Sequence, residues 1–177
     1  MARKNLKKNR RMIVIFSILL VAAIFYVLFR NFLFPEIIEI KELSTIGFVE
    51  VGVSVNVSET EGIISLSDGC REIYMSIDTS QAISIENGMN RIIKIRPNTH
   101  DLMNDLLEGF GIKVLMVKIV EMRDNTYFSK LILRKGNVIL SLDSRPSDAI
   151  AIAARTSYMV PIYVKEDLLE EYGKKIC

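Results

Sequence analysis

The sequence predicts an α+β domain with a mostly antiparallel mixed sheet packed by short helices, preceded by one transmembrane helix. Three observations lead to this prediction. An uncharged apolar run stands near the N-terminus. Further along, segments with a period of two are mixed with short helical segments. Turn signals such as Asp68-Gly69 and Gly136-Asn137 separate neighbouring strand segments, and a chain dominated by hairpins in this mixture is typical of the α+β class.

The apolar run covers residues 12–29, MIVIFSILLVAAIFYVLF. As a helix, its 18 residues would reach roughly 27 Å, close to the thickness of a bilayer core. A buried core helix of this length normally has a polar stripe. A cleaved signal peptide normally ends in small residues, whereas this run continues into RNFLFPE. We therefore predict a retained transmembrane helix over residues 12–29, which makes the membrane a partner of the chain.

Charge is divided unevenly along the chain. Six cations and no acid precede the apolar run, so the positive-inside rule predicts a single-pass membrane protein with a cytoplasmic N-terminus and an extracytoplasmic domain. Seven of the 23 Lys and Arg lie before residue 36, whereas all 21 Asp and Glu lie from residue 36 onward. Residues 36–177 therefore have 16 cations, 21 acids and a net charge of −5. Proteins that hold nucleic acid through many phosphate contacts usually have a basic face. Any such binding here must therefore use a local patch.

The first elements of the domain follow a juncture at residues 30–47. Four valines between residues 51 and 57 alternate with small or polar residues, which predicts a half-buried strand. The segments GIISLSDG and REIYMSI predict two more short strands. The segment TSQAISIENG, residues 79–88, predicts a short helix that begins at a Thr or Ser cap and ends at Asn87-Gly88.

A second helix is predicted within RPNTHDLMNDLLEGFG, residues 96–111. Asn98 and Thr99 are candidate N-caps, and Asp101 places an acid in the first turn. Either Gly109 or Gly111 would end the helix. Its predicted apolar face consists of Leu102, Leu106 and Leu107.

The segments IKVLMVKIVEM, YFSKLILR and VILSLD predict three strands of an antiparallel meander, with the first strand central because it is apolar on both faces. A helix at residues 147–155 is apolar all round, which predicts burial between the sheet and a second element. In so small a domain this element would be a second copy of the chain, so we expect a homo-oligomer through the Ala-rich helix 147–155. A short strand, VPIYV, and an amphipathic helix, KEDLLEEYG, complete the domain.

Two segments share a pattern at predicted helix entrances: Arg96-Pro97-Asn98-Thr99-His100-Asp101 and Arg145-Pro146-Ser147-Asp148. The structural interpretation is that Pro is preorganised for the first helical position and that the acid meets the free N–H groups there. The functional interpretation uses the same geometry, because a helix N-terminus beside an Arg binds phosphate. Clustered carboxylates would hold a divalent cation that polarises a phosphoryl oxygen or activates water, and His100 would be a general base.

The functional interpretation names a set of candidate residues. The predicted catalytic residues are His100, Asp101, Asp143 and Asp148. The predicted phosphate-binding residues are Arg96, Thr99, Arg145 and Ser147. The candidate ligands of a divalent cation such as Mg²⁺ or Mn²⁺ are Asp101, Asp143 and Asp148.

These motifs also resemble a known family. RPNTHDLMNDLLEGFG, LDSRPSDAIAIAAR and PIYV are similar to segments of the bifunctional nuclease (BFN) domain family, in the same order and spacing over about residues 48–172. The resemblance implies an α+β domain that commonly self-associates, with nuclease activity on DNA and RNA in some members. The chain then divides into a basic cytoplasmic tail at 1–11, the transmembrane helix at 12–29, a juxtamembrane linker at 30–47, the BFN-like domain at 48–172 and a C-terminal tail at 173–177.

Two functions remain open from the sequence. The first is a membrane-anchored, metal-assisted nuclease that acts on the phosphodiesters of DNA, RNA or both. The second is a non-catalytic oligomeric module that binds or regulates at the membrane. The two cysteines, Cys70 and Cys177, have no metal-binding spacing, and the sequence leaves open whether they pair.

Overall fold

The computed structural model describes residues 19–23, 25–26 and 41–177 of the 177. The chain divides into two compact units, Met1–Ile40 and Lys41–Cys177. The predicted transmembrane segment 12–29 lies largely outside the described residues, and the part that is described, 19–23 and 25–26, is helical. Among the described residues no helix has both the length and the apolar character that a membrane span requires.

The unit Lys41–Cys177 contains two β-sheets and four helices, which confirms the predicted α+β class. One sheet has five strands in the order β1-β8-β5-β6-β7, and the other has four in the order β2-β3-β4-β9. The strands are β1 Phe48–Glu50, β2 Gly52–Val57, β3 Gly62–Ser67, β4 Arg71–Ile77, β5 Lys113–Arg123, β6 Thr126–Lys135, β7 Val138–Ser144, β8 Ile162–Lys165 and β9 Lys174–Lys175. The helices are α2 Thr79–Met89, α3 Thr99–Gly109, α4 Pro146–Ala153 and α5 Glu166–Tyr172.

The predicted meander is confirmed as β5, β6 and β7, which pair antiparallel in succession. Asp124 and Asn125 make the first turn with positive φ angles of 49° and 59°. Gly136 makes the second turn at φ 56°, a conformation that favours glycine. Strand β5 is central as predicted, and its other neighbour, β8, runs parallel to it. The five-stranded sheet is therefore mixed, and the four-stranded sheet is antiparallel throughout.

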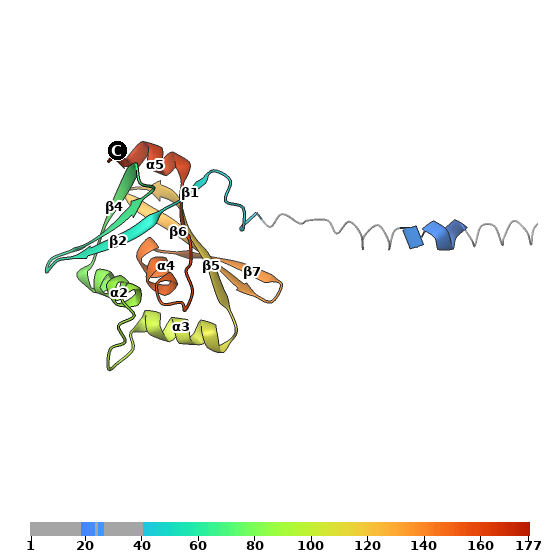
Figure 1. The fold of residues 1–177 in the computed structure, drawn as a ribbon, viewed down its shortest axis with the longest axis horizontal. Helices are drawn as coiled ribbons and strands as arrows, with labels where there is room; N and C mark the ends of the chain where they lie inside the picture. The colour runs from blue at the N-terminus through green and yellow to red at the C-terminus, as the bar shows by residue number, and fades with distance from the viewer. Residues whose placement is uncertain (1–18, 24, 27–40) are drawn as a thin grey trace, which may run out of the picture. The chain divides into compact units, whose positions relative to one another are not determined.

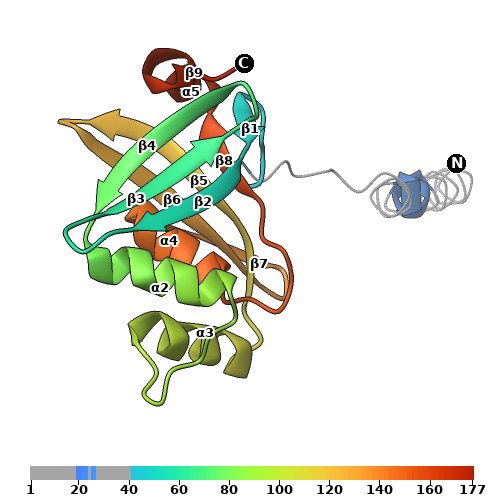
Figure 2. The same cartoon turned by 60° about the vertical axis from the view of Figure 1, so that its left-hand side comes forward.

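Helix α4 lies inside the domain, as Figures 1 and 2 show, where it packs against α2, α3 and strands β5 and β6. Ala149, Ile150 and Ala151 have no exposed surface at all. The apolar residues of the helix are therefore covered largely by the chain itself, and the homo-oligomer that we expected through residues 147–155 stays a prediction. A larger set of elements encloses this helix than the sequence pattern indicated, because residues from both sheets and from α2 join one continuous core.

Helix α3 begins where the sequence predicted, with Asn98 as N-cap. The Asn98 side chain accepts hydrogen bonds from the backbone N–H groups of His100 and Asp101, and the Asp101 carboxylate accepts from the N–H of Asn98. This reciprocal pair is a capping box. The predicted apolar face is wrong in part, since Leu107 is buried while Leu102 and Leu106 are exposed.

The C-terminal residues do not form a free tail. Strand β9 pairs with β4, and the backbone N–H of Ile176 donates to the carbonyl of Cys70. Cys70 and Cys177 form a disulfide across this pairing. The disulfide closes a loop of more than a hundred residues around α5 and the rest of the domain.

Candidate functional site

The two Arg-Pro motifs meet where the N-termini of α3 and α4 approach each other. The Nε2 atom of His100, in the first turn of α3, lies 3.2 Å from Oδ1 of Asp148, in the first turn of α4. Residues 48 positions apart in the sequence thus share one hydrogen bond. Both side chains are partly exposed, so this contact lies at the surface of the domain and not in its core.

Arg145 also contacts Asp148, on the exposed side of the pair. Its Nε and Nη2 atoms donate to the two oxygens of Asp148 at 2.6 and 3.0 Å, in a bidentate pair. Burial raises the pKa of Asp148, but the hydrogen bonds from Arg145 and His100 outweigh burial and hold this pKa below its usual value. Asp148 is therefore an ionised carboxylate at neutral pH, with a cation on one side and an imidazole on the other.

Ser84 lies on the inner side of His100. Its Oγ atom is 2.9 Å from His100 Nδ1 and receives hydrogen bonds from Asn98 Nδ2 and Arg155 Nη2, both at 3.0 Å. Because these two donors occupy the hydroxyl lone pairs, the Ser84 proton must point to Nδ1. We therefore assign the proton of neutral His100 to Nε2, from which it is donated to Asp148. Both ring nitrogens are engaged, which leaves no free lone pair for the general-base role that the sequence suggested.

Asp101 and Arg155 form a second, deeper ion pair. Arg155 Nε lies 2.5 Å from Asp101 Oδ1, and Arg155 Nη1 donates to the carbonyl groups of Ser84 and Ala151. The Arg155 side chain is only 6% exposed. Burial raises the pKa of Asp101, but the N–H of Asn98 and the guanidinium of Arg155 lower it to a net value below the usual one. The pair ties the first turn of α3 to the end of α4.

The structure separates three predicted residues from this network. Asp143, on β7, pairs with Lys130 at 3.0 Å, and its side chain is 70% exposed. Arg96 and Thr99 are exposed at the entrance of α3. Asp143 therefore lies in a surface ion pair of the five-stranded sheet, outside the hydrogen bonds that join His100, Asp148 and Arg145, and its catalytic role stays a prediction.

The acids do not fit the divalent cation that we predicted. Asp101 is paired with Arg155, Asp143 with Lys130, and Asp148 with Arg145. In the part of the chain that the structure describes, no three His, Cys, Asp or Glu side chains converge in a group suited to a metal ion. Any chemistry that we propose at this site therefore comes from its own side chains.

A cleft of about 820 Å³ opens beside Arg145. Ser147 lines this cleft and is 4% exposed, and among the described residues neither its Oγ nor its backbone N–H has a hydrogen-bond partner. The N–H is one of the free donors of the α4 N-terminus, where the N-cap residue Arg145 makes no side-chain capping bond. Among the described residues no fully buried side-chain oxygen or nitrogen lacks a partner, so the Ser147 Oγ is open to the cleft. An anion in the cleft would accept hydrogen bonds from these free donors. Gln81 also lines the cleft, next to the guanidinium of Arg145.

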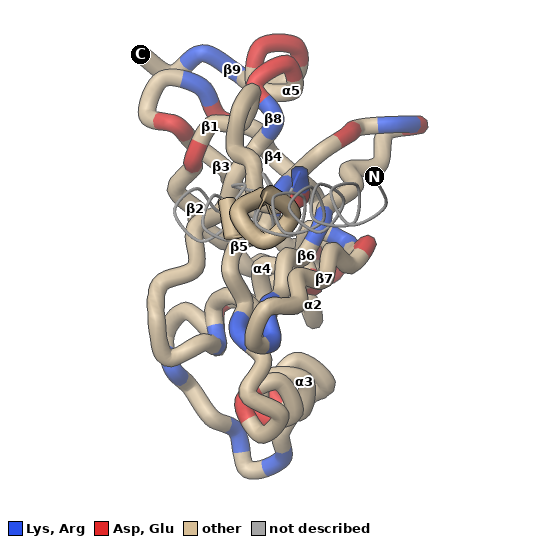
Figure 3. Tube along the Cα trace, turned by 90° about the vertical axis from the view of Figure 1, so that its right-hand side faces the viewer, with Lys and Arg blue, Asp and Glu red and all other residues tan. Residues whose placement is uncertain are grey.

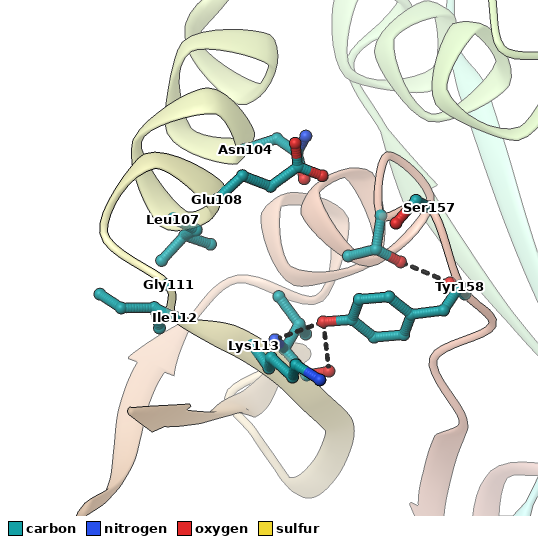
Figure 4. Close-up of a pocket in the computed structure, with 10 residues that line it drawn as sticks. Asn104, Leu107, Glu108, Gly111, Ile112, Lys113, Ser157 and Tyr158 are labelled. Carbon is teal, nitrogen blue, oxygen red and sulfur yellow. Dashed lines mark hydrogen bonds between the residues drawn. The ribbon is translucent and has the colours of Figure 1, made fainter. Parts of the chain in front are cut away.

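A second cavity, of about 320 Å³, lies between α3 and the loop that follows α4 (Figure 4). Tyr158 reaches across it, and its hydroxyl accepts from the N–H of Val114 at 2.8 Å and donates to the Val114 carbonyl at 3.1 Å. Leu107 and Glu108 line the α3 side. None of the predicted site residues lines this cavity. The two hydrogen bonds of Tyr158 tie the loop after α4 to the start of β5.

Sequence reasoning missed Ser84 and Arg155, although each left a signal. Ser84 is a hydroxyl between two isoleucines of a short helix, and Arg155 directly follows the uncharged apolar residues 149–154. A polar side chain at such a position must find a partner when it is buried. What the sequence could not supply was the identity of the partners, because these lie on three different helices.

Comparisons with known proteins agree with this geometry. A family model described as the bifunctional nuclease domain matches residues 63–176, which include both Arg-Pro motifs, Ser84 and Arg155. An uncharacterized protein of Mycobacterium tuberculosis strain H37Rv is 33% identical over 125 residues, which are 70% of this chain and 73% of that protein.

Two plant relatives carry the activity in their names. Bifunctional nuclease 1 of Oryza sativa subsp. japonica is 39% identical over 84 residues, 46% of this chain and 25% of that protein. Bifunctional nuclease 2 of Arabidopsis thaliana is 32% identical over 91 residues, 50% of this chain and 27% of that protein. The match to the plant proteins is thus confined to about a quarter of their length. By its match over most of the domain, the chain belongs to the bifunctional nuclease domain family.

Proposed function

We propose that the domain hydrolyses phosphodiester bonds of DNA, RNA or both at the cleft beside Arg145. The observation that carries this proposal is the Arg145–Asp148–His100 contact, which joins both family motifs. Of these residues Arg145 lines the cleft, together with Ser147 and its unpaired N–H and hydroxyl. The names of the plant relatives support the same activity. The proposal concerns this chain's own residues, since the plant proteins match it over only part of their length.

Binding of a phosphate would use Arg145 and Ser147. The guanidinium would contact two phosphate oxygens, and the free N–H and Oγ of Ser147 would donate to a third, with the positive end of the α4 dipole adding to the attraction. Arg145 is 67% exposed in its side chain, so it is free to turn toward the cleft. This small cationic patch is how a domain of net charge −5 would still hold a phosphodiester.

The arriving phosphate would also activate Asp148. When Arg145 turns to the phosphate, Asp148 loses two hydrogen bonds and a neighbouring charge, so its pKa rises and its carboxylate becomes a stronger base. A water oxygen then bonds to phosphorus while the bond from phosphorus to the leaving oxygen breaks. The water proton passes to Asp148, and the leaving alkoxide takes a proton from solvent. His100, held by Ser84, would orient Asp148 during this step.

A non-catalytic binding module is the second candidate, and one observation favours it. Asp101, Asp148, Arg145, Arg155 and His100 all have partners within the chain, so the network is complete as a structural device. On this account an anionic ligand would occupy the same cleft without being cleaved.

An assay of DNA and RNA cleavage separates the two candidates. The full chain would be measured with Mg²⁺, with Mn²⁺ and with a chelator, beside Asp148→Asn and the control Asp167→Asn, which lies in an exposed pair with Lys165. We expect Asp148→Asn to lose activity by about a hundredfold or more, as the loss of a proton acceptor does, and Asp167→Asn to retain it. A folded, pure chain that cleaves neither substrate under any condition would leave the binding module as the function.

We also propose that residues 12–29 anchor the chain in a membrane, with the domain on the extracytoplasmic side. The basic residues before the apolar run support this orientation. The Cys70–Cys177 disulfide supports it as well, because structural disulfides persist in oxidising compartments. Protease added to intact cells, or to spheroplasts where a wall intervenes, should degrade the domain. Complete protection that ends only on lysis would contradict the orientation.

A further inference from the structure

Four apolar residues of α3 and its C-cap are exposed, although Leu107 is buried. Leu102, Met103, Leu106 and Phe110 are 62%, 40%, 49% and 62% exposed. Their spacing places them on one continuous face of the helix and its C-cap, because residues three, four and eight positions apart lie on the same side. Exposed apolar residues are normally scattered, so a contiguous set on one helix marks a contact surface.

The polar residues of α3 lie on its other side. Asp101, Asp105 and Glu108 are spaced four and three residues apart and so form a second stripe. Asp101 and Asp105 line one cavity, of about 280 Å³, against α2, and Glu108 lines the cavity of Figure 4. The acids of α3 are thus directed to the domain and its crevices, while the outward face carries no charge.

The loop between α2 and α3 extends the same end of the domain. Ile93 and Ile95 are 88% and 101% exposed, and Lys94 and Arg96, also exposed, alternate with them. Residues 90–97 contain no acid. Figures 1 and 2 show this loop beside α3 at the end of the domain opposite α5, and Figure 3 shows basic segments on it. We call the loop and the apolar face of α3 the α3 tip.

We propose that the α3 tip docks on the surface of an anionic lipid bilayer. Bulky aliphatic side chains that insert at the boundary between headgroups and acyl chains, next to Lys and Arg that meet lipid phosphates, are the chemistry of an interfacial membrane contact. Each cation near an anionic surface strengthens binding about fivefold, which is about 1 kcal/mol. The domain leaves most of the surface of Ile93 and Ile95 in water, whereas a bilayer would remove both side chains from water.

The length of chain before the domain favours lipid over other occupants. Eleven residues, 30–40, separate the apolar run from the unit that begins at Lys41, and they can span at most about 40 Å. If residues 12–29 are anchored, this tether holds the α3 tip at a high effective concentration near the bilayer. A second copy would place the Lys94 and Arg96 loops of both chains at one interface, and nucleic acid offers no partner for the isoleucines and leucines.

The test uses the full chain reconstituted in vesicles, with a polarity-sensitive dye at Ile93→Cys. The native cysteines are paired with each other and do not compete for the label. The vesicles contain phosphatidylcholine with or without phosphatidylglycerol, and lipids that carry a quencher. We expect the dye to be quenched and blue-shifted in anionic vesicles, and quenching to fall severalfold in neutral vesicles or when Lys94→Glu and Ile95→Asn are added. A label at Asp167→Cys, on α5, should stay in water throughout.

Two results would overturn the docking. One is a dye at Ile93→Cys that stays in water in anionic vesicles. The other is shielding that appears in neutral vesicles and rises with the protein density, which would assign the α3 tip to a second copy. An alkaline wash tests the anchor separately. A chain that the wash removes has no transmembrane helix, yet its dye signal before the wash still decides whether the α3 tip contacts lipid.

Discussion

The two Arg-Pro motifs are alike in sequence and different in use. In the α4 motif, Arg145 pairs with its own Asp148 at the rim of a cleft, and Ser147 is left with free donors. In the α3 motif, Arg96 is exposed, and Asp101 turns inward to cap its helix and to bind Arg155. The α4 motif thus keeps a cation and an acid accessible, which is where we propose that a ligand binds, whereas the α3 motif holds helices of the domain together.

The difference comes from the partner that tertiary packing supplies. Each acid stands in the first turn of a helix, where the free N–H groups favour it. Arg155 comes from the end of α4 and reaches Asp101, so that pair is buried. No element covers Arg145, so its pair with Asp148 stays accessible. The two motifs are therefore similar in local sequence, and their long-range contacts differ: one acid is in a buried ion pair and the other in an accessible one.

The largest expected effect is on stability, from Arg155→Met. This change removes one partner of a buried ion pair and leaves Asp101 and the Ser84 carbonyl without their donor, so the free energy of unfolding should fall by about 3 kcal/mol. Arg96→Met should change it by less than about 0.5 kcal/mol, because Arg96 is exposed. Urea unfolding of both variants measures the contrast, and equal losses would show that the α3 motif is not the structural one.

Ser84→Ala should cost about 2 kcal/mol. The hydroxyl is the common partner of His100 Nδ1, Asn98 Nδ2 and Arg155 Nη2, and its removal leaves partly buried donors unsatisfied. Ser76→Ala, which removes an exposed hydrogen bond to Glu61, is the matched control and should be nearly neutral. If the two variants unfolded at the same urea concentration, Ser84 would not be the centre of the network.

Acid should weaken the two motifs together. The pKa values of Asp101 and Asp148 are both lowered in the folded chain, relative to an ordinary value of 3.8. Their contribution to stability is therefore present above about pH 4 and is lost as the pH falls through the lower folded values. The unfolding free energy should drop steeply below pH 4, and less steeply in Asp101→Asn. If Asp101→Asn left the dependence of the unfolding free energy on pH unchanged, the Asp101 carboxylate would not contribute to the acid sensitivity.

The smallest effect concerns the caps. Asn98→Ala removes the capping box of α3 and should cost about 1 kcal/mol. Arg145→Ala removes no cap, because Arg145 makes no side-chain capping bond, and its exposed pair with Asp148 contributes about 0.5 kcal/mol. Thermal unfolding measures the loss of stability in both variants. A larger loss in Arg145→Ala than in Asn98→Ala would contradict the structural role of the α3 motif.

Much of the fold could be predicted from the sequence because its signals are local. The hairpin turns at Asp124-Asn125 and Gly136 and the N-cap Asn98 each follow from one or two residues. The outward face of α3 could not be predicted, since Leu102 and Leu107 are the same residue type and only the position of α4 and the sheet decides which one is buried. The burial of α4 by its own chain was missed for the same reason.

The candidate site could be predicted as far as its two motifs and no further. His100, Arg145 and Asp148 stand beside helix entrances that the sequence marked, and the structure brings them together. Asp143 lies within β7, two residues before Arg145, and the register of β7 sets it opposite Lys130. The register of a strand and the partner across it are long-range properties, which explains why the sequence did not reveal that each of the three acids pairs with a different cation.

The most direct test of the account compares Asp148→Asn with Asp101→Asn in one cleavage assay, with rates expressed per folded molecule. We predict that Asp148→Asn unfolds at a higher urea concentration than Asp101→Asn, while its cleavage rate falls by about a hundredfold or more. Asp101→Asn should be the less stable variant and should keep most of its cleavage. Loss of cleavage in Asp101→Asn, with Asp148→Asn fully active, would contradict the assignment of binding and chemistry to the α4 motif.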